Sequence, residues 1–319
     1  MIKYIVKRLA MGVVTMFFLI TITFWLTRLM PGSPFATDNI SPSVLATLEA
    51  NYGFDKPIDQ QFVIYLQSLL QGNLGVSYTR TGVTVNDLIA QGFPVTLKLG
   101  LISFAIALVI GTVIGIWMST TKSSAVKGWL ITGSTLFISI PGFVLAIVLL
   151  MVFGQGLKVL PVLFDGSFLS YIMPVLALAV YPIAQISRLV HASYTEAMNQ
   201  DYVVMARAKG LGKRRIQFLH ILKNAMLPLI TVCGPMIAFQ ITGSFVVESI
   251  FTIPGIGEEF VNSVNSRDYT VIMGLTIFLG GVIIIANLIS DLACALVDPR
   301  IKLDRATILP AAADTGVPY

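Results

Sequence analysis

The side chains best suited to chemistry are sparse in this sequence and stand apart from one another. His191 and His220 occur singly, with no second metal ligand and no Ser or Cys nucleophile at a recognisable spacing. The motifs H-E-x-x-H, G-x-S-x-G and G-x-x-x-x-G-K-[ST], typical of zinc hydrolases, acyl transfer and phosphate binding, do not occur. We therefore expect a protein that is not an enzyme, that binds no metal or other cofactor itself and that does not hydrolyse ATP alone.

Two acidic residues, Glu248 and Asp291, fall within long apolar runs. Ionisable groups inside a membrane are costly and are candidates for function by default, so both are candidate pathway or gating residues. Each also lies near the end of its run, where a hydrated or ion-paired structural role is the alternative. Cys233 and Cys294 lack a second Cys or His at metal spacing, and we expect them to act as small apolar side chains.

The most concentrated charge lies in the segment from Ala206 to Arg215, ARAKGLGKRR, which holds five of the 21 Lys and Arg residues. The pattern predicts one helix over Glu196–Lys209 and another over Lys213–Met226, with a break at Gly210 and Gly212. Connections between helices in bundles usually take about 2 to 8 residues, so a loop this long is expected to dock onto another protein. The candidate docking residues are Ala206, Arg207, Ala208, Lys209, Gly210, Leu211, Lys213 and Arg214.

The amino-acid composition indicates which kind of structural element positions these residues. The 319-residue chain is 55% hydrophobic with a mean hydropathy of +0.84, which exceeds what a water-facing surface tolerates. A membrane-spanning helix needs roughly 20 mostly apolar residues. Six runs meet this requirement, and the sequence therefore predicts an all-α polytopic membrane protein with six transmembrane helices. The runs are Leu9–Met30, Leu99–Met118, Trp129–Leu157, Phe168–Val190, Met226–Ile250 and Val271–Val297.

The distribution of basic residues predicts the orientation. With the N-terminus in the cytoplasm, 15 of the 21 Lys and Arg residues fall in cytoplasmic segments, so the positive-inside rule places both termini there. The sequence pI of about 9.2 is then mainly a topology signal, which leaves membrane lipid and not nucleic acid as the expected charged partner. The first apolar run is too long for a cleaved signal peptide and is expected to remain as the first span.

The predicted regions are unequal in length. Residues 1–30 form the cytoplasmic start and first span, 31–94 an extracytoplasmic loop, 95–302 a five-helix core with the cytoplasmic loop at 191–225, and 303–319 a tail. In the extracytoplasmic loop, PGSP ends the first span, and Ser41 with Pro42 predicts a helix start. A second helix is expected from Asp59, and VSYTRTGVTV predicts a short strand pair or an extended turn. We expect a small extracytoplasmic cap; the alternative is a spacer with incidental amphipathic helices.

Several motifs carry a family resemblance. ARAKGL, followed by NAMLP between the fourth and fifth spans, resembles the cytoplasmic coupling loop of bacterial ABC importer permeases. PGSPF at 31–35, GSFVVESIFTIPGIGEEFVNSVNSRDY at 243–269 and DPRIK at 298–302 resemble the B-type permease subunit of oligopeptide and dipeptide importers. One departure concerns the general loop pattern, whose acidic first position is Val204 here and whose spacing to Leu227 and Pro228 is longer.

The resemblance implies a set of partners. It implies a pathway shared with a second, similar permease subunit, two cytoplasmic ATP-binding subunits that hold ATP and Mg²⁺, and an extracytoplasmic peptide-binding protein that delivers peptide. It also implies the bacterial cytoplasmic (inner) membrane and a coupling loop that rests in a groove of the ATP-binding subunit. For Lys213, Arg214 and Arg215 the alternative is that they only mark the cytoplasmic side.

Two other classes of function remain open from the residues alone. An ion-coupled secondary transporter or channel could use Asp291 and Glu248, although such proteins often contain two related halves and no internal repeat is found. A membrane-anchored scaffold would carry no substrate across the membrane. Only the importer requires ATP-binding subunits in fixed stoichiometry with this chain.

Overall fold

The computed structural model describes residues 2–29 and 53–297. Within these ranges the chain is almost entirely helical, and its one β feature is an isolated antiparallel bridge between Val76 and Thr84. The helix expected from Ser41, the PGSPF and DPRIK motifs and the tail all lie outside, or largely outside, the described residues. The described helices include five that are long and apolar enough to cross a membrane, and a bent pair that makes a sixth span if counted as one. The all-α, multi-span prediction is therefore confirmed.

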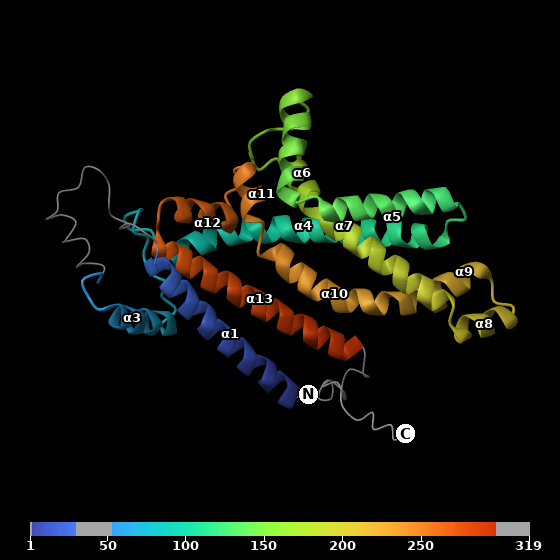
Figure 1. The fold of residues 1–319 in the computed structure, drawn as a ribbon, viewed down its shortest axis with the longest axis horizontal. Helices are drawn as coiled ribbons and strands as arrows, with labels where there is room; N and C mark the ends of the chain where they lie inside the picture. The colour runs from blue at the N-terminus through green and yellow to red at the C-terminus, as the bar shows by residue number, and fades with distance from the viewer. Residues whose placement is uncertain (1, 30–52, 298–319) are drawn as a thin grey trace, which may run out of the picture.

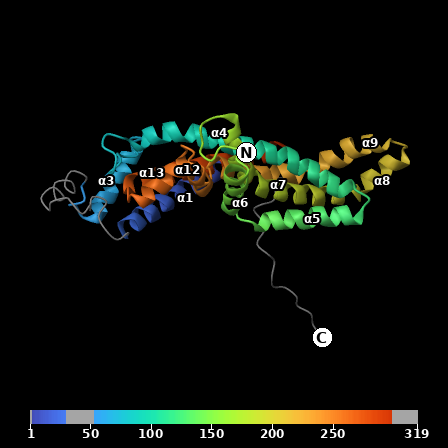
Figure 2. The same cartoon turned by 90° about the horizontal axis from the view of Figure 1, so that it is seen from above.

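The long helices lie side by side along the length of the molecule (Figure 1). In chain order the span-forming elements are α1 (Ile2–Leu29), α4 (Val85–Thr120), the bent pair, α7 (Phe168–Met198), α10 (Lys223–Ile241) and α13 (Tyr269–Val297). Helix α1 lies along α13, and α10 lies between α13 and α7 (Figure 1). Four short helices lie toward the two ends: α8 (Asp201–Ala208) and α9 (Lys213–Arg215) at one, α3 (Ile58–Leu70) and α12 (Ile256–Asn265) at the other (Figures 1 and 2).

Helices α4 and α7 form the most extensive contact in the bundle. A Cβ atom at Gly115 of α4 would lie 2.6 Å from the backbone oxygen of Ser187 in α7, so only glycine permits this approach. Around the contact, Ala107, Ala179, Ile186 and Val190 are fully buried. Small residues at such contacts are common in membrane bundles because they let helix backbones approach closely. This packed pair provides the frame on which the loops at both ends are mounted.

The third apolar run is not one straight span. Helix α5 (Ser124–Ser139) is followed by α6 (Gly142–Leu149) and the π-helix η1 (Leu150–Gly156), and the two arms meet at 97°. Pro141 explains the bend, because proline disfavours helical backbone at the residue before it, and Ile140 is extended with ψ of 119°. The expected single helix over Trp129–Leu157 is wrong in this respect.

The fifth run is also divided. Helix α10 ends at Ile241 and the separate helix α11 (Phe245–Ile250) follows it, with Gly243 between them at a φ of +83°. The side chain of Ser244 caps α11 by accepting from the backbone N–H of Val247 at 3.4 Å. The hydropathy pattern did not reveal this interruption because the residues on both sides of it are apolar.

The second and fourth spans extend beyond their predicted limits. Helix α4 begins at Val85, inside the segment assigned to the extracytoplasmic loop, because Thr84 and Asp87 form a capping box there. Pro94 therefore lies inside the helix. Helix α7 continues past Val190 to Met198, so Glu196 belongs to this span and not to the loop helix predicted over Glu196–Lys209.

The segment between α3 and α4 is a turn docked onto the start of α13. The helix predicted from Asp59 is confirmed as α3, and VSYTRTGVTV forms a turn closed by the single Val76–Thr84 bridge. Asp268 is fully buried beneath this turn and accepts hydrogen bonds from Ser77 Oγ and from the backbone N–H of Tyr78 at 3.2 Å. Its carboxylate also accepts from the backbone N–H of Val271 at 3.3 Å, which caps α13.

Candidate functional site

The loop between α7 and α10 is a helix, a tight turn and a second helix. Helix α8 ends at Ala208, and Gly210 follows with a φ of +73°. The backbone N–H of Leu211 donates to the carbonyl of Ala206 at 3.2 Å and that of Gly210 to the carbonyl of Arg207 at 3.0 Å, which satisfies the free end of α8. Glycine suits this left-handed position because any other side chain adds backbone strain.

The inner face of this loop packs against the ends of the spans. Val203 and Ala206 of α8 are buried together with Tyr194 of α7 and with Ile216 and Ile221 of the π-helix η2 (Ile216–Leu222). Ala206, predicted to dock onto a partner, therefore packs within its own chain and fixes the position of α8. Leu211 is half-buried against the same cluster. The loop is thus rigidly attached to α7 and, through η2, to α10.

The outer face of α8 is open. Arg207, Ala208, Lys209 and Gly210 are exposed, as are Lys213 and Arg214 beyond the turn. Two apolar residues share this exposure: the side chains of Val204 and Met205 are 58% and 60% exposed. Neither residue is among the predicted docking residues. The signal that could have found them is the helical period, since burial of Val203 and Ala206 on one face directs Val204 and Met205 outward.

The apolar residues at helical spacing in the second loop helix are partly buried and partly exposed. Ile221 and Ala225 are buried and Leu222 is half-buried, but Phe218 is 66% exposed and its neighbour Leu219 is also exposed. Large apolar side chains that point away from a chain's own core are typical of interaction surfaces. Phe218 and Leu219 therefore add to the open apolar surface of the loop.

The basic residues after the turn are placed against the helix dipole. Lys213, Arg214 and Arg215 form the first turn of the helix that continues through η2 into α10, and Gly212 provides no side-chain cap. Cations at a helix N-terminus are unfavourable, by about 0.3 to 1 kcal/mol each when exposed. Helix stability therefore does not explain why three basic residues occur in succession here. Neither Lys213 nor Arg214 forms an ion pair with any described residue.

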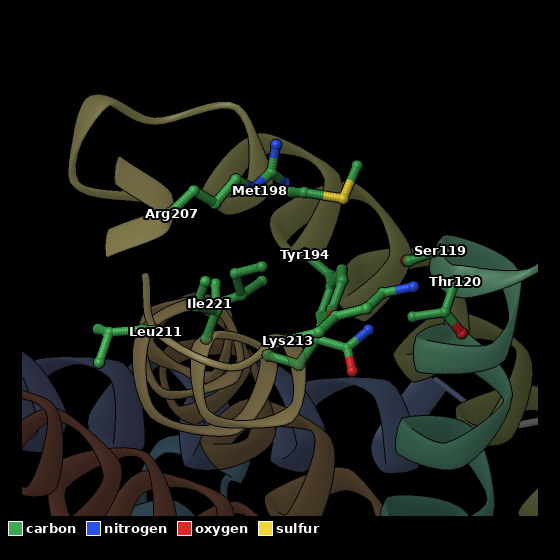
Figure 3. A pocket seen from close by; sticks show the side chains of 10 residues that line it. Ser119, Thr120, Tyr194, Met198, Arg207, Leu211, Lys213 and Ile221 are labelled. Atoms are coloured by element: carbon green, nitrogen blue, oxygen red, sulfur yellow. The ribbon is translucent and has the colours of Figure 1, made fainter. Parts of the chain in front are cut away.

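A cavity of about 480 Å³ lies under the loop (Figure 3). Arg207 of α8 and Lys213 of α9 line it together with Tyr194 of α7 and with Ser119 and Thr120 at the end of α4. Two cations thus face one hollow beside the docking loop. The predicted break between the loop helices brings them there, because Gly210 turns the chain back on itself.

Glu248 is fully buried in α11 and joins three helices. Its carboxylate accepts from Thr96 Oγ1 of α4 at 3.0 Å and from the backbone N–H of Gly257 in α12 at 2.9 Å. Thr96 Oγ1 in turn accepts from the backbone N–H of Ile256 at 2.9 Å. Side chains at Gly243, Gly255 or Gly257 would collide with the carboxylate. This arrangement locks α11 and α12 onto α4, and Glu248 holds packed helices together within this chain.

Asp291 of α13 is paired rather than free. Its carboxylate accepts a hydrogen bond from Arg8 Nη2 in α1 at 3.1 Å, and Arg8 Nη1 lies 3.1 Å from its other oxygen as an ion pair. The pair is part-buried and ties the first described helix to the last. Asp291 and Glu248 lie in different parts of the bundle, so the structure does not bring the two candidate pathway residues together.

The remaining candidates have local partners. His191 Nδ1 lies 2.9 Å from Ser119 Oγ, which connects α7 to α4. The backbone carbonyl of His220 accepts from the side-chain amide of Asn224 at 2.8 Å. Cys233 and Cys294 are free thiols, and both are half-buried or at the edge of the packed region. Among the described residues no group of three or more His, Cys, Asp or Glu side chains is arranged to hold a metal ion.

A multi-span helical bundle with a rigidly mounted helix-turn-helix loop at one end is the architecture of a membrane component of a transport system. Two family models match the sequence. Residues 111–303 match the binding-protein-dependent transport system inner membrane component, and residues 1–100 match the N-terminal region of such membrane components. The chain belongs to this family.

Individual relatives match over nearly the full length. The chain is 39% identical over 307 residues to the dipeptide transport system permease protein DppB of Lactococcus lactis subsp. cremoris, covering 95% of this chain and 100% of that protein. It is 41% identical over 309 residues to the oligopeptide transport system permease protein OppB of Salmonella typhimurium, with the same coverage. The relatives are transport permease proteins.

Solved structures agree on the fold. The MetNI methionine ABC transporter in an inward-facing conformation aligns with a TM-score of 0.56 at 16% identity, covering 66% of this chain and 96% of the matched chain. An amino acid ABC transporter aligned with a TM-score of 0.51 at 18% identity, covering 67% and 94%. The shared architecture is that of an ABC transporter membrane subunit.

Proposed function

We propose that this chain forms the translocation pathway of an ATP-driven peptide importer together with a second, similar permease subunit. Two cytoplasmic ATP-binding subunits, which hold ATP and Mg²⁺, drive it, and an extracytoplasmic binding protein delivers the peptide. The relatives named for dipeptide and oligopeptide transport support peptide as the cargo. In this assembly the chain lies in the bacterial inner membrane with both termini in the cytoplasm, as its basic residues favour.

The observation that carries the proposal is the two-faced loop at α8. Its inner face is fixed to α7 and η2 by buried Val203 and Ala206, while its outer face leaves Val204 and Met205 open beside cations that have no ion-pair partner among the described residues. Small and apolar residues allow close approach to a groove on the ATP-binding subunit, and Lys213 and Arg214 can pair with acidic groups there.

The attachment of the loop suggests how motion is transmitted. Since α8 packs on α7, and η2 continues without interruption into α10, a displacement of the docked loop moves the ends of two spans together. Alternating access then follows from rigid-body movement of these helices when the ATP-binding subunits close. No chemistry by this chain is required for that movement.

The decisive experiment changes only the open face of α8. A Met205→Glu variant places a charge on the docking surface without touching the buried cluster, and Leu163→Glu adds the same charge at an exposed apolar position outside the loop. We expect Met205→Glu to reduce co-purification of the ATP-binding subunits and peptide uptake in proteoliposomes by about tenfold or more. Leu163→Glu should retain those subunits fully. Normal subunit retention and uptake by Met205→Glu would refute docking through this face.

A further inference from the structure

At the end of the molecule opposite the docking loop, three helices enclose a polar hollow. The end of α1, helix α3 and the start of α13 lie near one another there (Figures 1 and 2). They line a cavity of about 370 Å³ whose polar walls include Arg28, Lys56, Gln61, Tyr65 and Tyr78. The described residues that line it include two cations, Arg28 and Lys56, and no acidic residue.

Four polar atoms that line this cavity have no hydrogen-bond partner among the described residues. Arg28 Nε and Nη1, Gln61 Oε1 and the Tyr65 hydroxyl are buried and make no hydrogen bond. Burying such groups without partners costs roughly 1 to 3 kcal/mol for each neutral group and more for a charged one. Burial raises the pKa of Tyr65, so its hydroxyl remains a hydrogen-bond donor. Most of these atoms are hydrogen-bond donors, so together they suit the binding of an anion.

Aromatic rings hold the cation in place. The guanidinium carbon of Arg28 lies 4.3 Å from the ring centroid of Phe54 and 5.2 Å from that of Phe24. The Phe24 ring also contacts those of Phe62 and Tyr65, at 5.1 and 6.2 Å between centroids, which fixes α1 against α3. The guanidinium is therefore pre-positioned, so little side-chain entropy is lost when an anion binds.

Deeper along the same helices lies a second, apolar hollow of about 520 Å³. The described residues that line it are all hydrophobic and come mainly from α1, α3 and α13: Val13, Met16, Phe17, Ile20, Leu66, Leu69, Leu70, Leu74 and Ile277. On α1 the two sets of residues form one stripe with spacings of three and four. Phe17 lies eleven residues from Arg28, or about 16 Å along the helix axis. That distance is close to the thickness of one leaflet, about half of a 30 Å hydrocarbon core.

We infer that these two hollows together form a binding site for one anionic glycerophospholipid, with the headgroup phosphate at Arg28 and Lys56 and an acyl chain in the apolar groove. A phosphate oxygen accepts the hydrogen bonds that Arg28 and Tyr65 leave unmade, and two cations favour a headgroup with net negative charge. A free anion would leave the groove unfilled, and an apolar chain alone would leave the donors unsatisfied. The lipid comes from the outer leaflet if the chain has the orientation proposed above.

The test measures lipid bound to the purified, delipidated importer complex by native mass spectrometry. Phosphatidylglycerol, phosphatidylcholine with the same acyl chains, and soluble glycerol phosphate are added separately. We expect phosphatidylglycerol to bind to the wild type about tenfold more tightly than to an Arg28→Gln variant. Lys98→Gln, which removes an exposed cation outside the cavity, is the matched control and should bind like the wild type.

A second pair of variants tests the groove. Val13→Trp fills the apolar hollow, whereas Val14→Trp adds the same ring at the next position, which does not line it. Only Val13→Trp should weaken binding of phosphatidylglycerol, and glycerol phosphate should compete poorly. Equal binding by Arg28→Gln and wild type would overturn the inference. Unchanged binding by Val13→Trp together with strong competition by glycerol phosphate would also overturn it, because that result indicates a simple anion site. A structure of the complex in which residues 30–52 or another subunit fill the hollows would overturn it as well.

Discussion

The turn at 76–84 and the loop at α8 lie at opposite ends of the molecule and treat charge in opposite ways. At the end that carries α3 and α12, Asp268 is buried under the turn at 76–84, and Arg80 forms two hydrogen bonds with the carboxylate of Glu259. At the other end, Lys213 and Arg214 begin a helix with no ion-pair partner among the described residues, beside exposed Val204 and Met205. The turn at 76–84 completes its own polar contacts, whereas the hollow at Arg28 on the same side leaves several unmade. The loop leaves its contacts to be made by another subunit.

This difference indicates which surface can bind another subunit without loss of contacts inside the chain. The pKa of Arg80 is raised because of its hydrogen bonds to Glu259, so the group stays charged at all physiological pH values. The contact to Asp268 requires burial of the carboxylate, which is stable only because several donors surround it. Rearranging this end would cost internal hydrogen bonds, whereas covering the loop costs none.

The largest expected effect is on the turn at 76–84, whose polar contacts are made within the chain. Asp268→Ala removes the acceptor for Ser77, Tyr78 and Val271 and leaves buried donors without a partner. We expect a loss of about 3 to 5 kcal/mol in the free energy of unfolding, as for breaking a buried charged network. Thermal unfolding of the detergent-solubilised complex measures it. Asp268→Asn, which keeps an acceptor oxygen, should lose less; an unchanged melting temperature for Asp268→Ala would show that the turn does not depend on this carboxylate.

The next effect is on the loop and concerns function rather than stability. Gly210→Val should insert normally but lose most peptide uptake, because a β-branched residue at a φ of +73° adds about 1 to 2 kcal/mol of backbone strain and distorts the turn. No atom of this chain lies within 4 Å of the added Cβ, so a local clash would not be the cause. Uptake, ATPase rate and subunit retention are measured in proteoliposomes.

A matched variant separates conformation from side-chain chemistry at this turn. Asparagine tolerates the left-handed region, so Gly210→Asn should retain much more uptake than Gly210→Val. Wild-type uptake by Gly210→Val with normal subunit retention would mean that the turn is only a connector. The contrast between the turn at 76–84 and the loop would then depend only on the exposed residues of the loop.

The smallest effect is expected from the charges of the loop. Replacing Lys213 and Arg214 together by Gln should weaken retention of the ATP-binding subunits a few-fold at low salt and very little at high salt, since exposed ion pairs are screened. Retention measured over a series of salt concentrations gives the result. A loss independent of salt would show that these residues act through helix structure, and no loss at any salt would favour their role as topology signals alone.

The sequence by itself determined the class of fold and the location of the loop. Hydropathy and helical period are local properties, so the apolar runs, α3 from near Asp59 and the break at Gly210 could be predicted from them. The helical period also predicts that Val204 and Met205 point outward once Val203 and Ala206 are buried. Family motifs identified the loop because their residues are adjacent in the chain.

Only the tertiary structure decided which side chains are buried and what they contact. Glu248 meets Thr96 from 152 residues away, and Asp291 meets Arg8 from 283 residues away, distances over which no periodic pattern carries information. Ala206 points into the cluster around Tyr194 because α8 packs back on α7. The 97° bend at Ile140 and Pro141 could be suspected from the proline, yet Pro94 and Pro228 lie inside continuous helices. A proline bends or breaks a helix when its neighbours cannot replace the lost backbone contact, and packing alone determines that.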